Sequence, residues 1–217
     1  WPAEKTALLL CDVWNSHWCR GAVERLDAMV EQMEQVVETV RDMGGLIVHA
    51  PSNTMDFYAD SPARKRAGVA PLLEPPPDRE RVDPPLPIDA SDNGSDTGET
   101  EAHKAWHRQH QAIGINEQQD IISDNGVEVY SCLQHMGIEH LLIMGVHTNM
   151  CVLHRTFAIK QMVRWGIEVV LIRDLTDSMY NPAMPPYVSH DEGTRLVIEF
   201  IEKFWCPSVE SSDIIGA

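Results

Sequence analysis

The sequence predicts a three-layer α/β/α domain with a central, mostly parallel β-sheet. Short apolar runs alternate with longer segments of helical periodicity, which is the succession expected of β-α-β units. The chain has 217 residues, enough for one such domain with a substantial core. Hydrophobic residues make up 43% and charged residues 23% of the chain, as in ordinary globular proteins. We therefore expect one domain, residues 1–217, with an irregular insertion at about 51–104.

The first fifty residues predict two strands joined by a long helix. Thr6–Cys11 (TALLLC) is a continuous apolar run, typical of a strand buried on both faces. Apolar residues then recur at helical spacing over Val23–Met43, and Gly44-Gly45 is expected to end that helix. Leu46–Ala50 (LIVHA) is the next expected strand.

The insertion at about 51–104 lacks either periodicity. It holds most of the prolines and a polar, acidic stretch at 88–101 that we interpret as a solvated loop. So long a structureless loop is unusual in a compact domain. We interpret the insertion as a lid or a subunit-contact arm with a short helix near Pro62–Gly68.

The alternation of strands and helices resumes after the insertion. We expect strands at about 105–108, 140–145 and 168–173, and helices at about 127–136, 149–165 and 191–204.

The net charge of the chain limits the classes of molecule that we expect it to bind. The formal net charge is −16, which repels nucleic acid and anionic membrane surfaces. No apolar run approaches the length of a membrane span. We expect a small-molecule substrate, and neither nucleic acid nor membrane as a partner.

The five cysteines are irregularly spaced and include no Cys-x-x-Cys pair, so no zinc ribbon or thioredoxin-type motif is present. This usage favours a reduced compartment such as the cytoplasm. Because the chain begins at Trp1 rather than Met, a removed N-terminal signal segment remains an alternative.

Two residues at strand ends carry the predicted chemistry. In parallel sheets active sites gather at the carboxyl ends of the strands. Asp12 follows the first strand, and Cys151 follows the strand at 140–145 within GVHTNMC. A thiol in the first turn of a helix is stabilised as thiolate by the helix dipole, which suits a nucleophile. The alternative for Cys151 is an inert core cysteine.

The segment GVHTNMCVLHRTFAIKQMVRWGIEVVLIRD, together with the N-terminal LLLCD, resembles the isochorismatase-like cysteine hydrolases. The resemblance covers residues 6–50 and about 105–205 and implies a Rossmann-like sheet and an Asp–Lys–Cys triad. It implies Cys151 as nucleophile, Asp12 as proton relay and a cis peptide at Val146–His147. The N–H groups of His147 and Cys151 would form the oxyanion hole. The presence of the cysteine favours hydrolysis of an amide C–N bond through a thioester, without a cofactor.

The sequence departs from the family pattern at the triad lysine. The corresponding region reads HKAWHRQHQ, and we choose Arg108 as the catalytic cation, with Lys104 and His110 as weaker candidates. Arginine can hold a carboxylate and a thiolate in place but cannot relay a proton.

The Asp-x-His metal motif of nicotinamidase members is also missing, so we expect no metal. A metal-assisted amidase that uses His17, His49 or Asp56 remains the first alternative. The second is a binding protein that kept the fold without catalysis.

The residues expected to bind the substrate are those near the strand ends and the nucleophile turn: Trp14, His17, His110, Thr148 and Tyr180. The family resemblance also leads us to expect a homo-oligomer.

Overall fold

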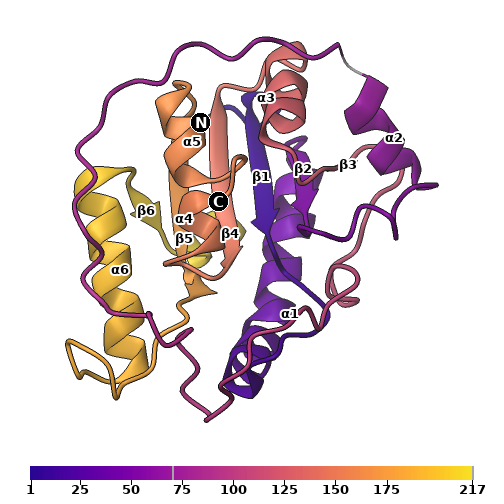
Figure 1. Cartoon of the computed structure of the whole chain (residues 1–217). Helices are drawn as coiled ribbons and strands as arrows, with labels where there is room; N and C mark the ends of the chain where they lie inside the picture. Colours follow the sequence, from indigo (N-terminus) through magenta and orange to yellow (C-terminus); the bar gives the residue numbers. More distant parts are fainter. Residues whose placement is uncertain (70, 217) are drawn as a thin grey trace.

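The computed structural model describes residues 1–69 and 71–216 and has the predicted three-layer α/β/α architecture (Figure 1). Ala70, within the predicted insertion, and Ala217 lie outside the described residues. Six strands form one sheet in the order β3-β2-β1-β4-β5-β6, and neighbouring strands are parallel. The strands are β1 (Thr6–Cys11), β2 (Leu46–Ala50), β3 (Ile121–Ile122), β4 (His140–Val146), β5 (Glu168–Asp177) and β6 (Ser208–Val209).

Helices cover both faces of the sheet (Figure 1). Apolar side chains of α1 and α7 pack on one face, and those of α3, α4, α5 and α6 pack on the other. The helices are α1 (Arg20–Asp42), α2 (Pro62–Val69), α3 (Gly126–His135), α4 (Cys151–His154), α5 (Ile159–Arg164), α6 (His190–Phe204) and α7 (Ser212–Ile215), with a short 3-10 helix at Ala3–Lys5. Within the described residues, no helix combines the length and apolar character needed to cross a bilayer.

The pairing of β1 with β4 positions the predicted site at the centre of the sheet. Cys11 lies opposite Gly145 in the parallel register, so Asp12 and the turn after β4 emerge side by side. A Cβ atom on Gly145 would lie 2.0 Å from the Cys11 carbonyl oxygen, and the φ of Gly145 is +122°. Only glycine fits this position, because a side chain would push the two central strands apart.

The predicted strand at 105–108 is wrong. These residues run irregularly, and the nearest pairing is one isolated antiparallel bridge between Trp14 and Gln109. The third strand is instead β3, which lies beside β2 and has two residues. A strand of two residues leaves no periodic pattern in the sequence. Residues 105–108 have a composition that favours a strand, but their polar neighbours outweigh that preference.

The predicted helix at 149–165 is interrupted. Arg155 has an extended conformation with ψ 149°, which ends α4 after four residues, and α5 begins at Ile159. The break packs against the start of α3, where the Gly126 N–H donates to the Thr156 hydroxyl. Gly126 approaches the Thr156 carbonyl closely enough that a Cβ atom would lie 2.1 Å from its oxygen. The hydrogen bond and the close packing account for the break.

The insertion contains the predicted short helix as α2, and its remainder forms an extended strap, residues 71–105. Figure 1 shows the strap running around the outside of the molecule from near α2 past α6. It is fixed by separate contacts with many elements. These include Leu73 N–H to Ser131 on α3, Arg79 N–H to the Arg164 carbonyl on α5, Asp83 with Lys160 on α5, Asp92 with Asn181, and Asp96 with Arg25 on α1.

The acidic end of the strap is not the solvated loop that the composition suggested. Ser95 is buried, and the Asp96 carboxylate forms a bidentate ion pair with Arg25, with N–O distances of 2.8 and 3.1 Å. The Thr97 hydroxyl accepts a hydrogen bond from the Gly21 N–H at the start of α1. A basic side chain on α1 therefore draws this acidic segment onto the body of the domain.

Candidate active site

Asp12 is a fully buried carboxylate at the carboxyl end of β1. Its φ of 51° lies in the left-handed region, which aspartate tolerates better than most residues. One carboxylate oxygen accepts the Ser52 N–H at 2.7 Å, and the other accepts Nε of Arg155 at 2.9 Å. Burial raises the pKa of Asp12, opposed by the charge of Arg155 and by hydrogen bonds from Cys151 and Ser52. Asp12 is thus a carboxylate fixed in position by hydrogen bonds, and its pKa lies above the ordinary value.

Cys151 opens α4 and contacts this carboxylate. It is partly buried and lines a surface hollow of about 450 Å³, together with Asn149, Met150, His154 and Arg155. Burial and then the charge of Asp12 raise the pKa of the Cys151 thiol to about 12. The four-residue α4 has a correspondingly small dipole. A thiol with so raised a pKa keeps its proton at neutral pH, which differs from the predicted resting thiolate.

The cation beside Asp12 is Arg155, four residues after Cys151. Arg108, the predicted cation, instead donates to Gln111 at 2.9 Å and lies over the Phe57 ring. Lys104, near the end of the strap, donates a hydrogen bond to the Asn53 carbonyl. The break after α4 gives Arg155 its extended backbone, from which its side chain turns back to β1. The position of Arg155 depends on this break in the helix, which the sequence pattern does not reveal.

The turn after β4 supplies backbone N–H groups near the sulfur. The Val146–His147 peptide bond is cis, as the resemblance implies. The His147 N–H faces the Cys151 sulfur and lowers its pKa slightly against the larger effect of burial. Thr148, predicted to bind substrate, is completely buried: its N–H donates to the Asp177 carbonyl and its hydroxyl bonds Thr176 at 2.7 Å. Thr148 therefore holds the turn in place.

A cluster of aromatic rings extends from Asp12 to this turn. Trp14 and Trp106 stack with centroids 3.9 Å apart, and His17 lies parallel to Trp106 at 5.7 Å. The His17 ring meets His147 edge-on at 4.8 Å. Burial lowers the pKa of His17 to about 4 and that of His147 to about 3, so both rings are neutral at neutral pH. The structure thus gathers the predicted residues Trp14 and His17 and adds Trp106, which the sequence analysis missed.

Two other predicted substrate-binding residues lie elsewhere. Tyr180 is completely buried in the core, where its hydroxyl donates to the Met184 carbonyl and Gly193 packs on its ring. His110 lies 3.2 Å from Asp27 on α1 and lines a different cavity, shared with Arg108.

The candidate metal ligands do not come together. Both ring nitrogens of His49 are engaged, one with Gln109 and one with Asp120, each at 3.0 Å. His17 packs in the aromatic cluster, and Asp56 is exposed. Across residues 1–69 and 71–216, no group of three or more His, Cys, Asp or Glu side chains is arranged to hold a metal ion.

An ion network anchors the far side of the turn. Asp177 at the end of β5 bonds Nε of Arg25 at 2.9 Å and Nε2 of His190 at 2.8 Å. Arg25 also holds Asp96 of the strap. Because the Asp177 carbonyl accepts the Thr148 N–H, this network connects the strap to the turn beside Cys151.

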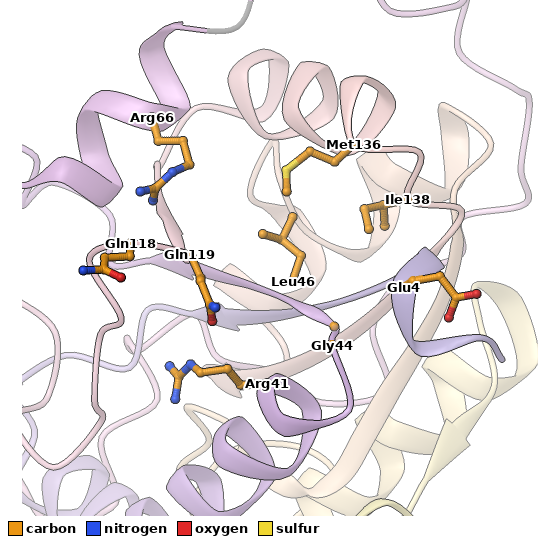
Figure 2. Close-up of a pocket in the computed structure, with 10 residues that line it drawn as sticks. Glu4, Arg41, Gly44, Leu46, Arg66, Gln118, Gln119, Met136 and Ile138 are labelled. Atoms are coloured by element: carbon orange, nitrogen blue, oxygen red, sulfur yellow. The ribbon is translucent and has the colours of Figure 1, made fainter.

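A separate cavity of about 400 Å³ lies near the amino end of β2, away from Cys151 (Figure 2). Arg41 and Arg66 reach into it from α1 and α2 (Figure 2). Arg41 pairs with the buried Asp120, and Arg66 donates to the carbonyls of Asp120 and Glu117. These contacts explain both arginines as ties between the helices and the 116–120 segment.

Comparison with known proteins agrees with this geometry. Residues 6–183 match the isochorismatase domain. The chain belongs to the isochorismatase family. Among curated proteins, none matches the chain.

Solved structures share this isochorismatase-like hydrolase fold at low sequence identity. A cysteine hydrolase from Pseudomonas syringae pv. phaseolicola has a TM-score of 0.65 and 14% identity, over 100% of this chain and 94% of that one. A putative isochorismatase hydrolase from Oleispira antarctica has a TM-score of 0.61 and 16% identity, over 99% and 97%. A pyrazinamidase of Pyrococcus horikoshii in complex with zinc has a TM-score of 0.52 and 16% identity, over 95% and 99%.

Proposed function

We propose that this isochorismatase-family hydrolase cleaves the C–N bond of a small amide, with Cys151 as nucleophile and Asp12 as the group that accepts and returns the proton. One observation carries the proposal: Arg155, four residues after Cys151, bonds the buried Asp12 carboxylate, and the pairing of β1 with β4 brings that carboxylate and the thiol to the same edge of the sheet. A protonated thiol becomes nucleophilic when an adjacent base removes its proton during attack.

The reaction follows from this arrangement. As the sulfur attacks the amide carbon, its proton moves to Asp12 and the carbonyl oxygen becomes an oxyanion. The N–H groups of His147 and Cys151 stabilise that oxyanion. Collapse breaks the C–N bond, and the leaving amine takes the proton from Asp12, which leaves a thioester. Water, deprotonated by Asp12, then attacks the thioester and releases the carboxylic acid and the thiol.

Arg155 tunes the carboxylate without joining the proton transfers. A guanidinium stays charged throughout the working pH range, so it cannot take the thiol proton. Its ion pair lowers the pKa of Asp12 against the effect of burial. The pairing with Arg155 therefore favours the charged, basic form of the carboxylate.

The surroundings of the site favour an uncharged substrate. The rings of Trp14, Trp106, His17 and His147 form a continuous aromatic cluster with neutral imidazoles. Such a surface contacts planar, uncharged groups by stacking. We therefore propose a small, neutral amide, aromatic or otherwise planar, as the substrate class.

The test is a panel of small amides and esters assayed with wild type and with Cys151→Ala, Cys151→Ser and Asp12→Asn. We expect all three variants to lose on the order of 10³-fold or more in kcat/KM while staying folded. Mass spectrometry of quenched wild-type reactions should detect a thioester on Cys151. Cys132→Ala, a buried thiol on α3, is the matched control and should retain activity.

Two results would replace this function with its rivals. Turnover by Cys151→Ala at the wild-type rate, with loss of activity in chelator, would indicate metal-assisted hydrolysis. Absence of turnover across the panel, together with slow and unselective alkylation of Cys151, would indicate a binding protein.

A further inference from the structure

The backbone of one residue, Ser52, links two tryptophans to the candidate catalytic carboxylate. The Ser52 N–H donates to Asp12 at 2.7 Å. The carbonyl of the same residue accepts two indole N–H groups, from Trp14 at 3.2 Å and from Trp106 at 3.1 Å. Ser52 itself is buried, with 3% of its surface exposed.

We propose that Trp14 and Trp106 are positioning residues, which orient Asp12 through the Ser52 backbone and strengthen its hold on the carboxylate. The inference rests on the proposed function, in which Asp12 moves the proton. The N–H and the carbonyl of Ser52 lie on either side of its Cα, so two indoles that fix the carbonyl also restrict the direction in which the N–H points. A hydrogen bond weakens steeply as it departs from linearity, and the bond from this N–H ends on a carboxylate and is charge-assisted, which makes its geometry consequential.

The rings are themselves held in place by stacking. Trp14 lies two residues after Asp12 and is buried, whereas Trp106 comes from the irregular segment before β3. The interplanar angle of the two indoles is 14°, and that of His17 with Trp106 is 7°. Trp106 is therefore fixed by its neighbours in the aromatic cluster and by its hydrogen bond, although its backbone belongs to no strand or helix.

Replacement of an indole by a phenyl ring isolates the hydrogen bond from the charges around Asp12. The charged and titratable groups that face Asp12 are Arg155 and Cys151 on or next to α4, and Cys11 on β1. Trp106→Phe leaves all three unchanged and keeps an aromatic ring in the stack. A change in the titration of the site then reports the loss of the hydrogen bond from the indole to the Ser52 carbonyl.

The experiment measures the rate of Cys151 alkylation by iodoacetamide from pH 4 to 10, which needs no knowledge of the substrate. The acid limb of this profile reports loss of the first proton from the Asp12–Cys151 pair. In Trp106→Phe we expect the limb to move to higher pH by about half to one unit, so that the rate at a fixed pH on the limb falls about 3- to 10-fold. Trp14→Phe should move it in the same direction.

The matched control is Trp205→Phe. Trp205 is buried in the core far along the chain, and its indole N–H has no hydrogen-bond partner among the described residues. The control should therefore keep the wild-type profile. Near-UV circular dichroism monitors folding, and Trp106→Phe carries the test if Trp14→Phe does not fold, because Trp106 is only partly buried.

An unmoved acid limb in folded Trp106→Phe would overturn the inference, and so would a uniform loss of rate at every pH. Failure of the proposed function looks different. In that case Cys151→Ala would still hydrolyse amides, whatever the alkylation profiles of the tryptophan variants show.

Discussion

The candidate site depends on the carboxylate of Asp12, because burial makes its negative charge energetically unfavourable. Buried ions are retained in proteins when they are paired and hydrogen-bonded. Here Arg155 provides the counter-charge and Ser52 the backbone donor, while the thiol completes the set. Loss of any one partner leaves the carboxylate closer to its protonated form.

Arg155→Gln should therefore impair both activity and stability. With the ion pair gone, the pKa of Asp12 rises further and less of the base is present at neutral pH. We expect on the order of 10²-fold lower kcat, and a loss of about 1–3 kcal/mol in the free energy of unfolding, moderated because a third of the arginine side chain is exposed. Arg108→Gln is the comparison and should change either quantity little. Urea titrations and steady-state assays give both values, and equal effects of the two substitutions would contradict the assignment.

Gly145→Ala should destabilise the centre of the sheet. The new Cβ would lie 2.0 Å from the Cys11 carbonyl at a φ that disfavours side chains. We expect at least about 3 kcal/mol lower free energy of unfolding, or an unfolded protein. Gly44→Ala has a positive φ but open space around the new methyl group, and it should cost less. Similar unfolding midpoints for the two variants would refute the close-contact argument.

The site was predictable where chemistry follows a strand end and unpredictable where it depends on a bend in the backbone. Strand-end position together with the family resemblance indicated Asp12 and Cys151 as candidates, since both follow apolar strands that a parallel sheet aligns. Arg155 depends on the break in the helix after Cys151, which periodicity does not reveal. Trp106 lies in a segment without any pattern, and only the fold shows that its indole reaches Ser52.

At the scale of elements, long periodic segments were predicted well and short ones poorly. The predicted helix at Val23–Met43 and strands at Thr6–Cys11 and Leu46–Ala50 correspond closely to α1, β1 and β2. The strands β3 and β6 have two residues each, below the length at which alternation can be recognised. Sheet pairing with longer neighbours, rather than local sequence, determines these strands.

The link between β5 and α6 predicts a pH-dependent stability. Burial alone would lower the pKa of His190, but the hydrogen bond and charge of Asp177 outweigh it and raise the pKa above 6.5. A raised pKa means that protonated His190 stabilises the folded state below its unfolded pKa. That contribution is lost as the pH rises through the folded pKa. Asp177, whose pKa is lowered, contributes stability that is lost only in acid, so its contribution stays constant in this window.

We therefore expect the free energy of unfolding to fall as the pH rises above 6.5 through the raised folded pKa of His190, with a smaller fall in His190→Gln. Urea titrations at several pH values measure the slope. His103→Gln, on the strap and exposed, is the control and should keep the wild-type slope. A slope that is the same in His190→Gln and wild type would exclude His190 as its source.

At the scale of the whole molecule, the strap adds tertiary contacts that the alternating strands and helices of the domain do not make with one another. It touches α3, α5 and α1 through isolated hydrogen bonds and ion pairs instead of a ladder. Lys160 is the most buried of its charged partners, with 8% of its side chain exposed, and lies 2.6 Å from Asp83. The sequence predicted an irregular insertion here but not its path, because no periodic pattern records separate side-chain contacts.

Asp83→Asn should loosen the strap from α5. The substitution leaves the buried Lys160 ammonium over the Trp205 ring without its carboxylate. We expect a loss of about 1–3 kcal/mol in the free energy of unfolding and faster proteolysis within residues 71–105. Asp78→Asn, whose partner Gln161 is neutral, should have a smaller effect on both. Unchanged proteolysis in Asp83→Asn would show that this ion pair does not hold the strap.

The break after α4 also makes the arrangement compact along the chain. The Cys151 thiol and the Arg155 guanidinium lie within Cys-Val-Leu-His-Arg, five consecutive residues. One short segment therefore positions both groups near Asp12, and an insertion or deletion within it would separate the guanidinium from the carboxylate.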